Sequence, residues 1–284
     1  MKILKSSREI AKMRRAGLLV WKAHQLAARM VRPGVTTGEI NEAIEEFLDE
    51  HGAVSLFKNY RPGPKLPPFP AVVCTSVNEQ IVHGIPGKRK LQAGDVLSLD
   101  IGCKLDGWCG DAAATYPVGK VHPEVQRLLE VTQGTLQLAI DMIRRLLDQW
   151  RQMREQLGPD QSPPWPRWRQ VASAMARYVQ RAGFWVVEDF VGHGIGQSMH
   201  EDPQVPNFPD RRGPDFALER GLVIAVEPMV NMGTKKVRTL GDRWTQVTAD
   251  GKPSAHFEHT IAITEAGPYI LTAGPDHKSP EEAC

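Results

Sequence analysis

The stretch from Val96 to Val118, VLSLDIGCKLDGWCGDAAATYPV, consists of two strand-like runs joined by the dipeptide Asp106-Gly107. Asp-Gly between strand-like runs is typical of a two-residue β-hairpin turn. Such a turn fixes the register, and the register makes Asp100 and Asp111 diagonal neighbours on one face of the hairpin. Two solvent-facing aspartates on a surface hairpin would give the same pattern, because aspartate is mostly exposed in proteins.

A weak internal repeat supports a shared role for these acids. The segment LQAGDVLSLD (91–100) aligns without gaps on LERGLVIAVE (218–227), and both segments end on an acid. A second acid opens a later strand-like run in each half, and a helical pattern ending in Gly precedes each segment. Although L-x-x-G-x-V is a common way to enter a strand, matching acids at both strand ends predict two halves whose carboxylates meet around a pseudo-two-fold axis. These acids are Asp100, Asp111, Glu227 and Glu258.

His193 completes the set of metal-capable side chains. It lies in GHGIG (192–196), where glycines let the imidazole project into a site. A lone histidine is more often an ordinary surface or core residue than a metal ligand. The later His200 and the strand-ending Pro228 after Glu227 nevertheless favour a functional role for His193. Four carboxylates and one imidazole suit two hard or borderline divalent ions, whereas a single zinc site more often uses Cys and His. The set predicts a two-metal hydrolase.

Six motifs stand along the chain around these residues. They are VHGIP (82–86), DIG (100–102), GHGIG (192–196), HEDPQVPN (200–207), EPMV (227–230) and FEHTIAIT (257–264). Together they resemble type I methionine aminopeptidase, over about residues 6–272. The resemblance implies an α+β "pita-bread" fold, with two pseudo-symmetric halves, a central antiparallel sheet and outer helices. It also implies removal of the initiator methionine from nascent polypeptides when the second residue is small.

The resemblance assigns roles to the five metal-capable residues. Asp100 would bind one ion, and His193 with Glu227 would bind the other. Asp111 and Glu258 would bridge both ions, and Glu227 would also accept a proton from the attacking water. The metal identity is left open among Co, Mn, Fe(II) and Zn, because availability decides such sites.

The resemblance also assigns the substrate contacts. His83 would contact the substrate near the scissile peptide bond, and His200 would donate to its carbonyl oxygen. The family usually has an aromatic residue in place of Met199 and often Tyr in place of Phe69, so we expect retained methionine selectivity with an altered rim. Extra prolines in residues 59–70 leave a role for Tyr60 open. The methionine pocket would be walled by Cys74, Phe69, Met199 and Trp244.

Two other functions share parts of this pattern. A proline-specific peptidase of the same fold would use the same ligands, but such enzymes usually carry a separate N-terminal domain. A metal-free relative could act as a ribosome- or partner-binding module, but such proteins tend to lose ligands, and here all five are present. The type I assignment rests on the short spacing between Glu227 and Glu258 and on the lack of an N-terminal extension.

Composition is that of an ordinary globular protein. The 284 residues carry a net charge of +2, which does not indicate specific nucleic-acid binding. No signal peptide or transmembrane-length run is evident, so we expect a cytoplasmic protein with no membrane partner. The lack of an evident apolar patch favours a monomer. The resemblance implies that the partners are the N-termini of nascent polypeptides, and it leaves proximity to the ribosome open. The four cysteines lack a CxxC pair, which favours reduced thiols, and pairing of Cys103 with Cys109 is left open.

The rest of the chain is expected to be scaffold. Two capping boxes, Ser6-x-x-Glu9 and Thr36-x-x-Glu39, predict helix starts, and Lys12, Arg14 and Arg15 are expected to form a solvated face. We expect a single catalytic domain over 1–272 and an unstructured tail over 273–284. An insertion at about 144–166 is predicted to extend a helix and to pack a proline-rich loop on the protein's own surface, with partner docking as the alternative.

Overall fold

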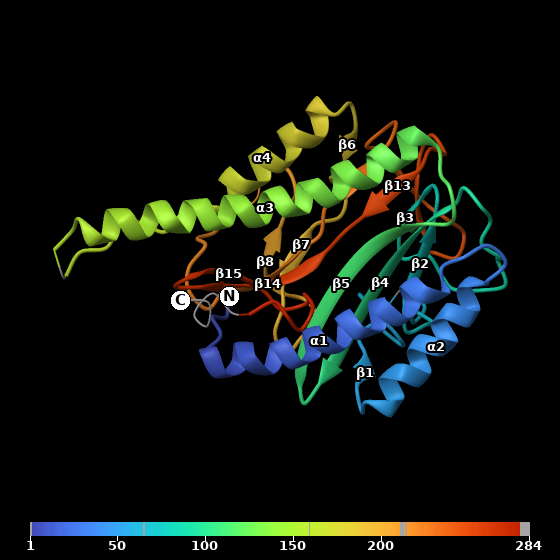
Figure 1. Cartoon of the computed structure of the whole chain (residues 1–284), viewed down its shortest axis with the longest axis horizontal. Coiled ribbons are helices and arrows are strands. Elements are labelled where there is room, and N and C mark those ends of the chain that lie inside the picture. The colour runs from blue at the N-terminus through green and yellow to red at the C-terminus, as the bar shows by residue number, and fades with distance from the viewer. Residues whose placement is uncertain (1, 65, 159, 211–212, 214, 279–284) are drawn as a thin grey trace.

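The computed structural model describes residues 2–64, 66–158, 160–210, 213 and 215–278. Helices α1 and α2 pack on the hairpin of the first half, and α3 and α4 pack on the sheet of the second half, with the strands between the helix pairs (Figure 1). The helices are α1 (Ser7–Met30), α2 (Thr37–Glu50), α3 (Pro123–Glu155) and α4 (Trp168–Arg181).

Two larger antiparallel sheets carry the two halves. In the first, β4 pairs with β1, β2 and β5, and in the second the strand order is β15-β14-β9-β7-β8. Two three-stranded sheets, β13-β10-β6 and β11-β12-β3, complete the strands. The bounds are β1 (Val54–Ser55), β2 (Cys74–Val77), β3 (Gln80–Val82), β4 (Val96–Leu105), β5 (Trp108–Pro117), β6 (Trp185–Val186), β7 (Gly192–Gly194), β8 (Glu201–Val205), β9 (Val223–Val226), β10 (Met229–Asn231), β11 (Val237–Thr239), β12 (Gln246–Thr248), β13 (Ser254–His256), β14 (His259–Thr264) and β15 (Gly267–Ile270).

The β4–β5 hairpin has the predicted register. Asp106 and Gly107 have φ values of 50° and 82°, which is the positive-φ pair of a type I′ turn. The turn sets Gly102 opposite Asp111, and Asp100 lies opposite the residue two positions further along β5. The diagonal relation between the two aspartates is therefore confirmed.

The two helix starts predicted from the capping boxes are confirmed. Ser6 and Glu9 form a capping box at α1, and Thr36 and Glu39 form one at α2. In each box the side chain of the cap residue accepts from the third backbone N–H, and the glutamate accepts from the cap backbone N–H. These bonds satisfy two of the backbone donors that every helix start leaves free.

Arg14 is buried, so the expectation that it belongs to a solvated face on α1 is wrong. Its guanidinium donates to the carbonyls of Leu271 at 2.8 Å, Ala273 at 2.6 Å and Gly274 at 2.6 Å. Residues 273–278 are thereby held against α1 instead of being unstructured, and residues 279–284 lie outside the described part of the chain. An arginine at a mid-helix position reads as surface until its distant partner is known.

The insertion packs on its own helix. The rings of Trp150 and Trp165 stack at 3.9 Å with an angle of 8°, and Trp150 Nε1 donates to the Pro163 carbonyl at 2.9 Å. The predicted extension of α3 and the packing of the proline-rich loop are confirmed. The apolar face of α3 does not continue to its end, because Met153 is exposed, as is Leu157 just beyond the helix.

Cys74, Cys103 and Cys109 are free thiols, and Cys284 lies outside the described residues. Cys103 and Cys109 therefore do not pair in this structure. Among the described helices, none combines the length and apolar character needed to cross a membrane.

Candidate functional site

One cavity of about 320 Å³ lies where the two halves meet. It is lined from strands of both halves and from the loops that precede β2 and β8. Every residue singled out from the sequence as a site residue lines it. These are Phe69, Cys74, His83, Asp100, Asp111, His193, Met199, His200, Glu227, Trp244 and Glu258.

The four carboxylates come from one antiparallel strand pair in each half. Asp100 lies within β4 and Asp111 within β5, so the expectation that these two acids end their strands is wrong, because the hairpin continues past both of them to its turn. Glu227 directly follows β9 and Glu258 comes just before β14, as expected for acids at strand ends. The backbone N–H of Glu258 donates to the carbonyl of Ala113 at 2.8 Å, which joins β14 to β5 across the two halves. The repeat seen in the sequence thus brings all four acids to one junction.

A second bond fixes the same junction. The Thr260 hydroxyl donates to the Asp111 carbonyl at 2.8 Å and accepts from the Asp111 backbone N–H at 3.1 Å. Because Asp111 and Thr260 come from different halves, this reciprocal pair locks the backbone beneath the carboxylates.

Three buried carboxylate oxygens at this junction have no hydrogen-bond partner in the part of the chain that the structure describes. They are Oδ1 of Asp100, Oδ1 of Asp111 and Oε1 of Glu258. Burying a charged oxygen without a partner costs several kcal/mol or more, so such atoms normally have a donor or a cation beside them. Asp111, His193 and Glu258 offer ligand atoms that all lie within 4.8 Å of one another. The residues present therefore fit a divalent metal.

The raised pKa values of these four acids also indicate that their charged forms need a positive charge nearby. Burial, together with repulsion from neighbouring carboxylates, raises the pKa of Asp100, Glu227 and Glu258 well above the ordinary range. Burial raises the pKa of Asp111 to about 7. A bound cation reverses this preference, because it stabilises the charged carboxylates.

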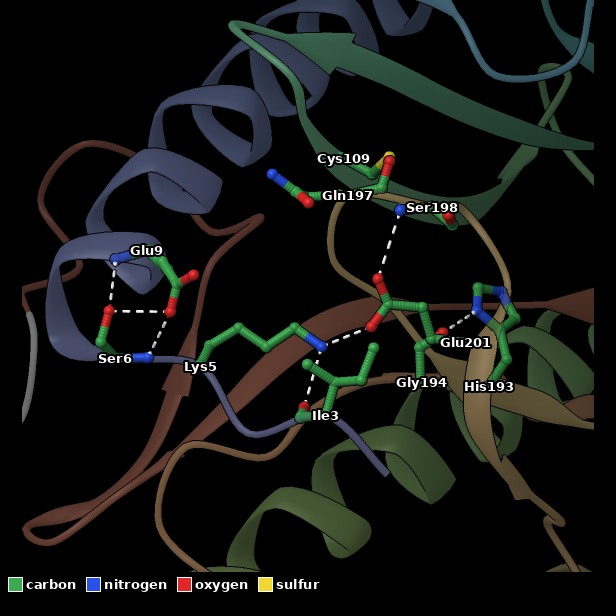
Figure 2. Close-up of polar contacts among 10 residues, drawn as sticks. All are labelled: Ile3, Lys5, Ser6, Glu9, Cys109, His193, Gly194, Gln197, Ser198 and Glu201. Atoms are coloured by element: carbon green, nitrogen blue, oxygen red, sulfur yellow. Dashed lines mark hydrogen bonds and ion pairs between the residues drawn. The ribbon is translucent and has the colours of Figure 1, made fainter. Parts of the chain in front are cut away.

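His193 is prepared to offer a lone pair. Its Nδ1 lies 2.9 Å from the Gly194 carbonyl oxygen, and Figure 2 shows this bond beside β7. A carbonyl only accepts, so Nδ1 carries the proton and Nε2 is left unprotonated. Metal-binding histidines typically donate their other nitrogen to a backbone carbonyl or a carboxylate in this way. Nε2 lies 3.6 Å from Oε1 of Glu227.

His200 lies at the mouth of the cavity and has a partner that the sequence left undecided. The Tyr60 hydroxyl lies 2.9 Å from Nδ1 of His200, and the His200 ring stands edge-on to His193 at 4.4 Å. Tyr60 also lines the cavity, which settles its place despite the prolines around it. Burial lowers the pKa of His200.

His83 is held by backbone conformation and by aromatic rings. Its φ is 60°, a left-handed value that is uncommon for a residue with a side chain. Its ring stands edge-on to Phe190 at 5.6 Å and to Trp244 at 6.1 Å. Residues held in this backbone region often lie at functional sites.

The expected pocket residues form one apolar cluster on the wall of the cavity. Phe69 stands edge-on to Trp244 at 5.3 Å, and the Trp244 indole N–H donates to the Pro67 carbonyl at 3.2 Å. Phe57 joins the cluster, although no motif distinguishes it from the other phenylalanines. The buried members are Phe57, Phe69, Ala71, Cys74, Met199 and Trp244.

The loop that carries Met199 and His200 is braced from the N-terminal segment. Lys5 forms a buried ion pair with Glu201 and donates to the Ile3 carbonyl at 2.9 Å (Figure 2). The other carboxylate oxygen of Glu201 accepts from the Ser198 backbone N–H at 3.2 Å. The loop therefore has its position set from outside the cavity.

Gly196 leaves room for this brace, and a larger residue there would force the Lys5–Glu201 pair to shift. A Cβ there would lie 2.5 Å from Oε1 of Glu201 and 2.6 Å from Cε of Lys5. Its carbonyl accepts from the Cys109 backbone N–H at 2.8 Å, which ties the loop to β5 as well. Gly196, the last glycine of GHGIG, thus allows the Lys5–Glu201 pair to pack closely, in addition to the role of the motif in carrying His193.

His256 is a cavity residue that the sequence analysis missed. It ends β13, lines the cavity and is 1% exposed. Its Nε2 lies 3.7 Å from Oε2 of Glu227. The position two residues before Glu258, in a strand-like run, was the available signal, because alternate strand residues share a face.

The sequence matches the description "Metallopeptidase family M24" over residues 11–265, and the chain belongs to this family. Within the family, its relatives include methionine aminopeptidases that it matches over nearly their whole length. Methionine aminopeptidase 1 of Bacillus subtilis is 44% identical over 271 residues, covering 95% of this chain and 98% of the relative.

Solved structures agree with the sequence match. Methionine aminopeptidase from Thermotoga maritima superposes with a TM-score of 0.84 at 37% identity, over 96% of this chain and 99% of that one. The enzyme from Rickettsia prowazekii gives a TM-score of 0.84 at 32% identity, over 96% and 100%. The predicted α+β pita-bread fold is confirmed.

The prolidase from Pyrococcus horikoshii superposes with a TM-score of 0.69 at 18% identity, and this chain covers 66% of it. At this identity the similarity shows a shared fold alone.

Proposed function

We propose that this chain is a type I methionine aminopeptidase, which removes the initiator methionine from nascent polypeptides when the second residue is small. The observation that carries the proposal is the meeting of five metal-capable side chains with an apolar pocket in one cavity. The full-length similarity to methionine aminopeptidases supports the substrate. Such a substrate places the work in the cytoplasm, close to ribosomes.

Two divalent ions would be held at the junction of the halves. Asp100 would bind one ion, His193 and Glu227 the other, and Asp111 and Glu258 both. Bound there, the ions would supply Lewis-acid activation of a water and of the scissile carbonyl. The orphaned carboxylate oxygens and the free lone pair of His193 support this assignment.

The protein's own groups would move the protons. Glu227, beside the cluster, would accept a proton from the attacking water. His200 would donate Nε2–H to the carbonyl oxygen of the scissile bond as negative charge develops there. Tyr60 supports this tautomer, because a hydroxyl that donates to Nδ1 leaves the proton of the ring on Nε2. His83, fixed between two aromatic rings, would contact the peptide near the scissile bond.

The apolar cluster would bind the methionine side chain. Cys74, Phe69, Met199 and Trp244 present sulfur and aromatic surface, and thioethers make favourable contacts with aromatic rings. A flexible Met199 at the rim should tolerate norleucine nearly as well as methionine. A peptide with N-terminal alanine leaves this pocket empty and should be cut far more slowly.

The test uses Met-Ala-Ser and Met-Leu-Ser peptides with metal-stripped protein and added Co²⁺ or Mn²⁺. We expect metal-dependent release of methionine from Met-Ala-Ser only, and loss of release in Glu227→Ala. Glu265→Ala, an exposed acid of the loop between β14 and β15, is the matched control and should retain activity. Cleavage of neither peptide with any metal would overturn the proposal. Cleavage of Ala-Pro peptides instead would identify a proline-specific peptidase.

A further inference from the structure

His256 has no role in the chemistry above, yet its ring lies inside the cavity. It is almost fully buried, and its Nε2 has no hydrogen-bond partner among the described residues. A buried polar atom without a partner normally points to a missing contact. The polar atom facing it is Oε2 of Glu227, at 3.7 Å.

The backbone of His256 is fixed on two sides. Its N–H donates to Oγ1 of Thr115 at 2.8 Å, and the Thr115 hydroxyl lies 2.9 Å from its carbonyl oxygen. Strand pairing sets His256 opposite Met229, which is only two residues after Glu227. The imidazole and the carboxylate are therefore held to the same short stretch of sheet.

The carboxylate of Glu227 lies between two imidazoles that present different atoms. His193 faces Oε1 with an unprotonated nitrogen, because its Nδ1 proton is used by the Gly194 carbonyl. A lone pair facing a carboxylate oxygen is favourable only with a cation beside both. His256 faces Oε2, and a carboxylate oxygen favours a nitrogen that carries a proton. Oε1 of Glu227 is thus suited to a metal ion, and Oε2 is suited to a hydrogen-bond donor from the protein.

We propose that His256 is a positioning residue that donates Nε2–H to Oε2 of Glu227 and so orients Oε1 toward the metal. A small rotation at the end of the glutamate side chain brings the two atoms within hydrogen-bond range. The donor holds the carboxylate in its charged form and in one rotamer. This inference rests on the metal centre of the proposed function.

The test compares His256→Leu, which removes the donor, with His256→Gln, which retains one. We expect the Kd for Mn²⁺, measured by titration calorimetry on the metal-stripped protein, to rise roughly 10- to 100-fold in His256→Leu. In His256→Gln it should stay within about threefold of wild type, since the amide can still donate. At saturating Mn²⁺, His256→Leu should lower kcat with little change in KM.

His24→Leu is the control for loss of a buried histidine. His24 is also buried, but it bonds Tyr116 and the Ala112 carbonyl away from the cavity, so His24→Leu should bind Mn²⁺ as wild type does. If His256→Leu does not fold, His256→Asn takes its place, because its amide is too short to reach Glu227.

The outcomes separate the two proposals. Wild-type Kd in a folded His256→Leu or His256→Asn overturns the role of His256 alone, as does equal weakening in His256→Gln. A wild-type protein that binds no Mn²⁺ overturns both the metal centre and this inference.

Discussion

At the scale of single residues, the site depends on which nitrogen of each imidazole carries its proton. The Gly194 carbonyl makes that choice for His193, because it can only accept, and in the proposed mechanism the Tyr60 hydroxyl would make it for His200 by donating to Nδ1. Such partners decide whether a ring can bind a cation or donate a proton.

Tyr60→Phe should lower kcat on Met-Ala-Ser roughly five- to tenfold, because it removes one hydrogen bond worth about 1 kcal/mol that selects the His200 tautomer. Steady-state kinetics on this peptide measures the change. Tyr178→Phe, on the outer helix α4, is the matched control and should leave kcat unchanged. An unchanged kcat in Tyr60→Phe would remove the role given to this bond.

His24 makes stability depend on pH. Burial lowers its pKa to about 4, below its unfolded value, so the unfolded chain binds a proton first as the pH falls. Its contribution is fully present above about pH 6.5 and is lost as the pH falls toward about 4, by roughly 3 kcal/mol in all. Urea unfolding of wild type and His24→Gln at pH 7 and pH 4.5 should show the wild-type advantage shrinking in acid. An advantage that does not change with pH would contradict this assignment.

At the scale of elements, local signals were sufficient for some parts and insufficient for others. The β4–β5 register followed from Asp106-Gly107 alone, since a two-residue turn leaves no freedom in the pairing. Arg14 was wrongly taken as solvated because its partners lie more than 250 residues away along the chain. His256 was missed because the polar atom nearest to its ring belongs to Glu227, which follows a different strand.

The brace between the N-terminal segment and β8 should matter more than its position suggests. Lys5→Met leaves the Glu201 carboxylate buried without its cation, which should cost about 3 kcal/mol of unfolding free energy. Lys2→Met, which breaks the partly exposed pair with Glu219, should cost below about 1 kcal/mol. Urea unfolding measures both.

The same two lysine variants test whether the Lys5–Glu201 pair influences the candidate active site. If Lys5 sets the loop that carries Met199 and His200, Lys5→Met should also lower kcat/KM at a temperature where it is fully folded. Equal kinetics in the two lysine variants would leave the brace a purely structural feature.

At the scale of the whole molecule, the halves are joined through a cluster of buried acids that repel one another. This makes the metal-free protein less stable than its packing alone would allow. The four acids could be found from the sequence because the repeat aligns Asp100 with Glu227, and a second acid opens a later strand-like run in each half. The apolar pocket was harder to predict, because its members come from separate loops and only the family motifs pointed to them.

Metal should therefore stabilise the fold directly. Mn²⁺ at 100 times its Kd should add about 2.7 kcal/mol to unfolding free energy, seen as a rise in Tm by calorimetry. Asp111→Asn should abolish this rise while making the metal-free protein at least as stable as wild type, since one repelling charge is gone. Asp141→Asn, on the exposed face of α3, should keep the full response. A full response in Asp111→Asn would show that the ions bind elsewhere.

The junction between Asp111 and Thr260 also has a consequence for the order of folding. The β4–β5 hairpin can form early, because its contacts are close in sequence, but it holds only Asp100 and Asp111. Glu227 and Glu258 arrive only when the C-terminal half docks, a closure over more than 100 residues. During refolding, tight uptake of the ion should therefore coincide with the last cooperative step and lag behind the first gain of β-structure.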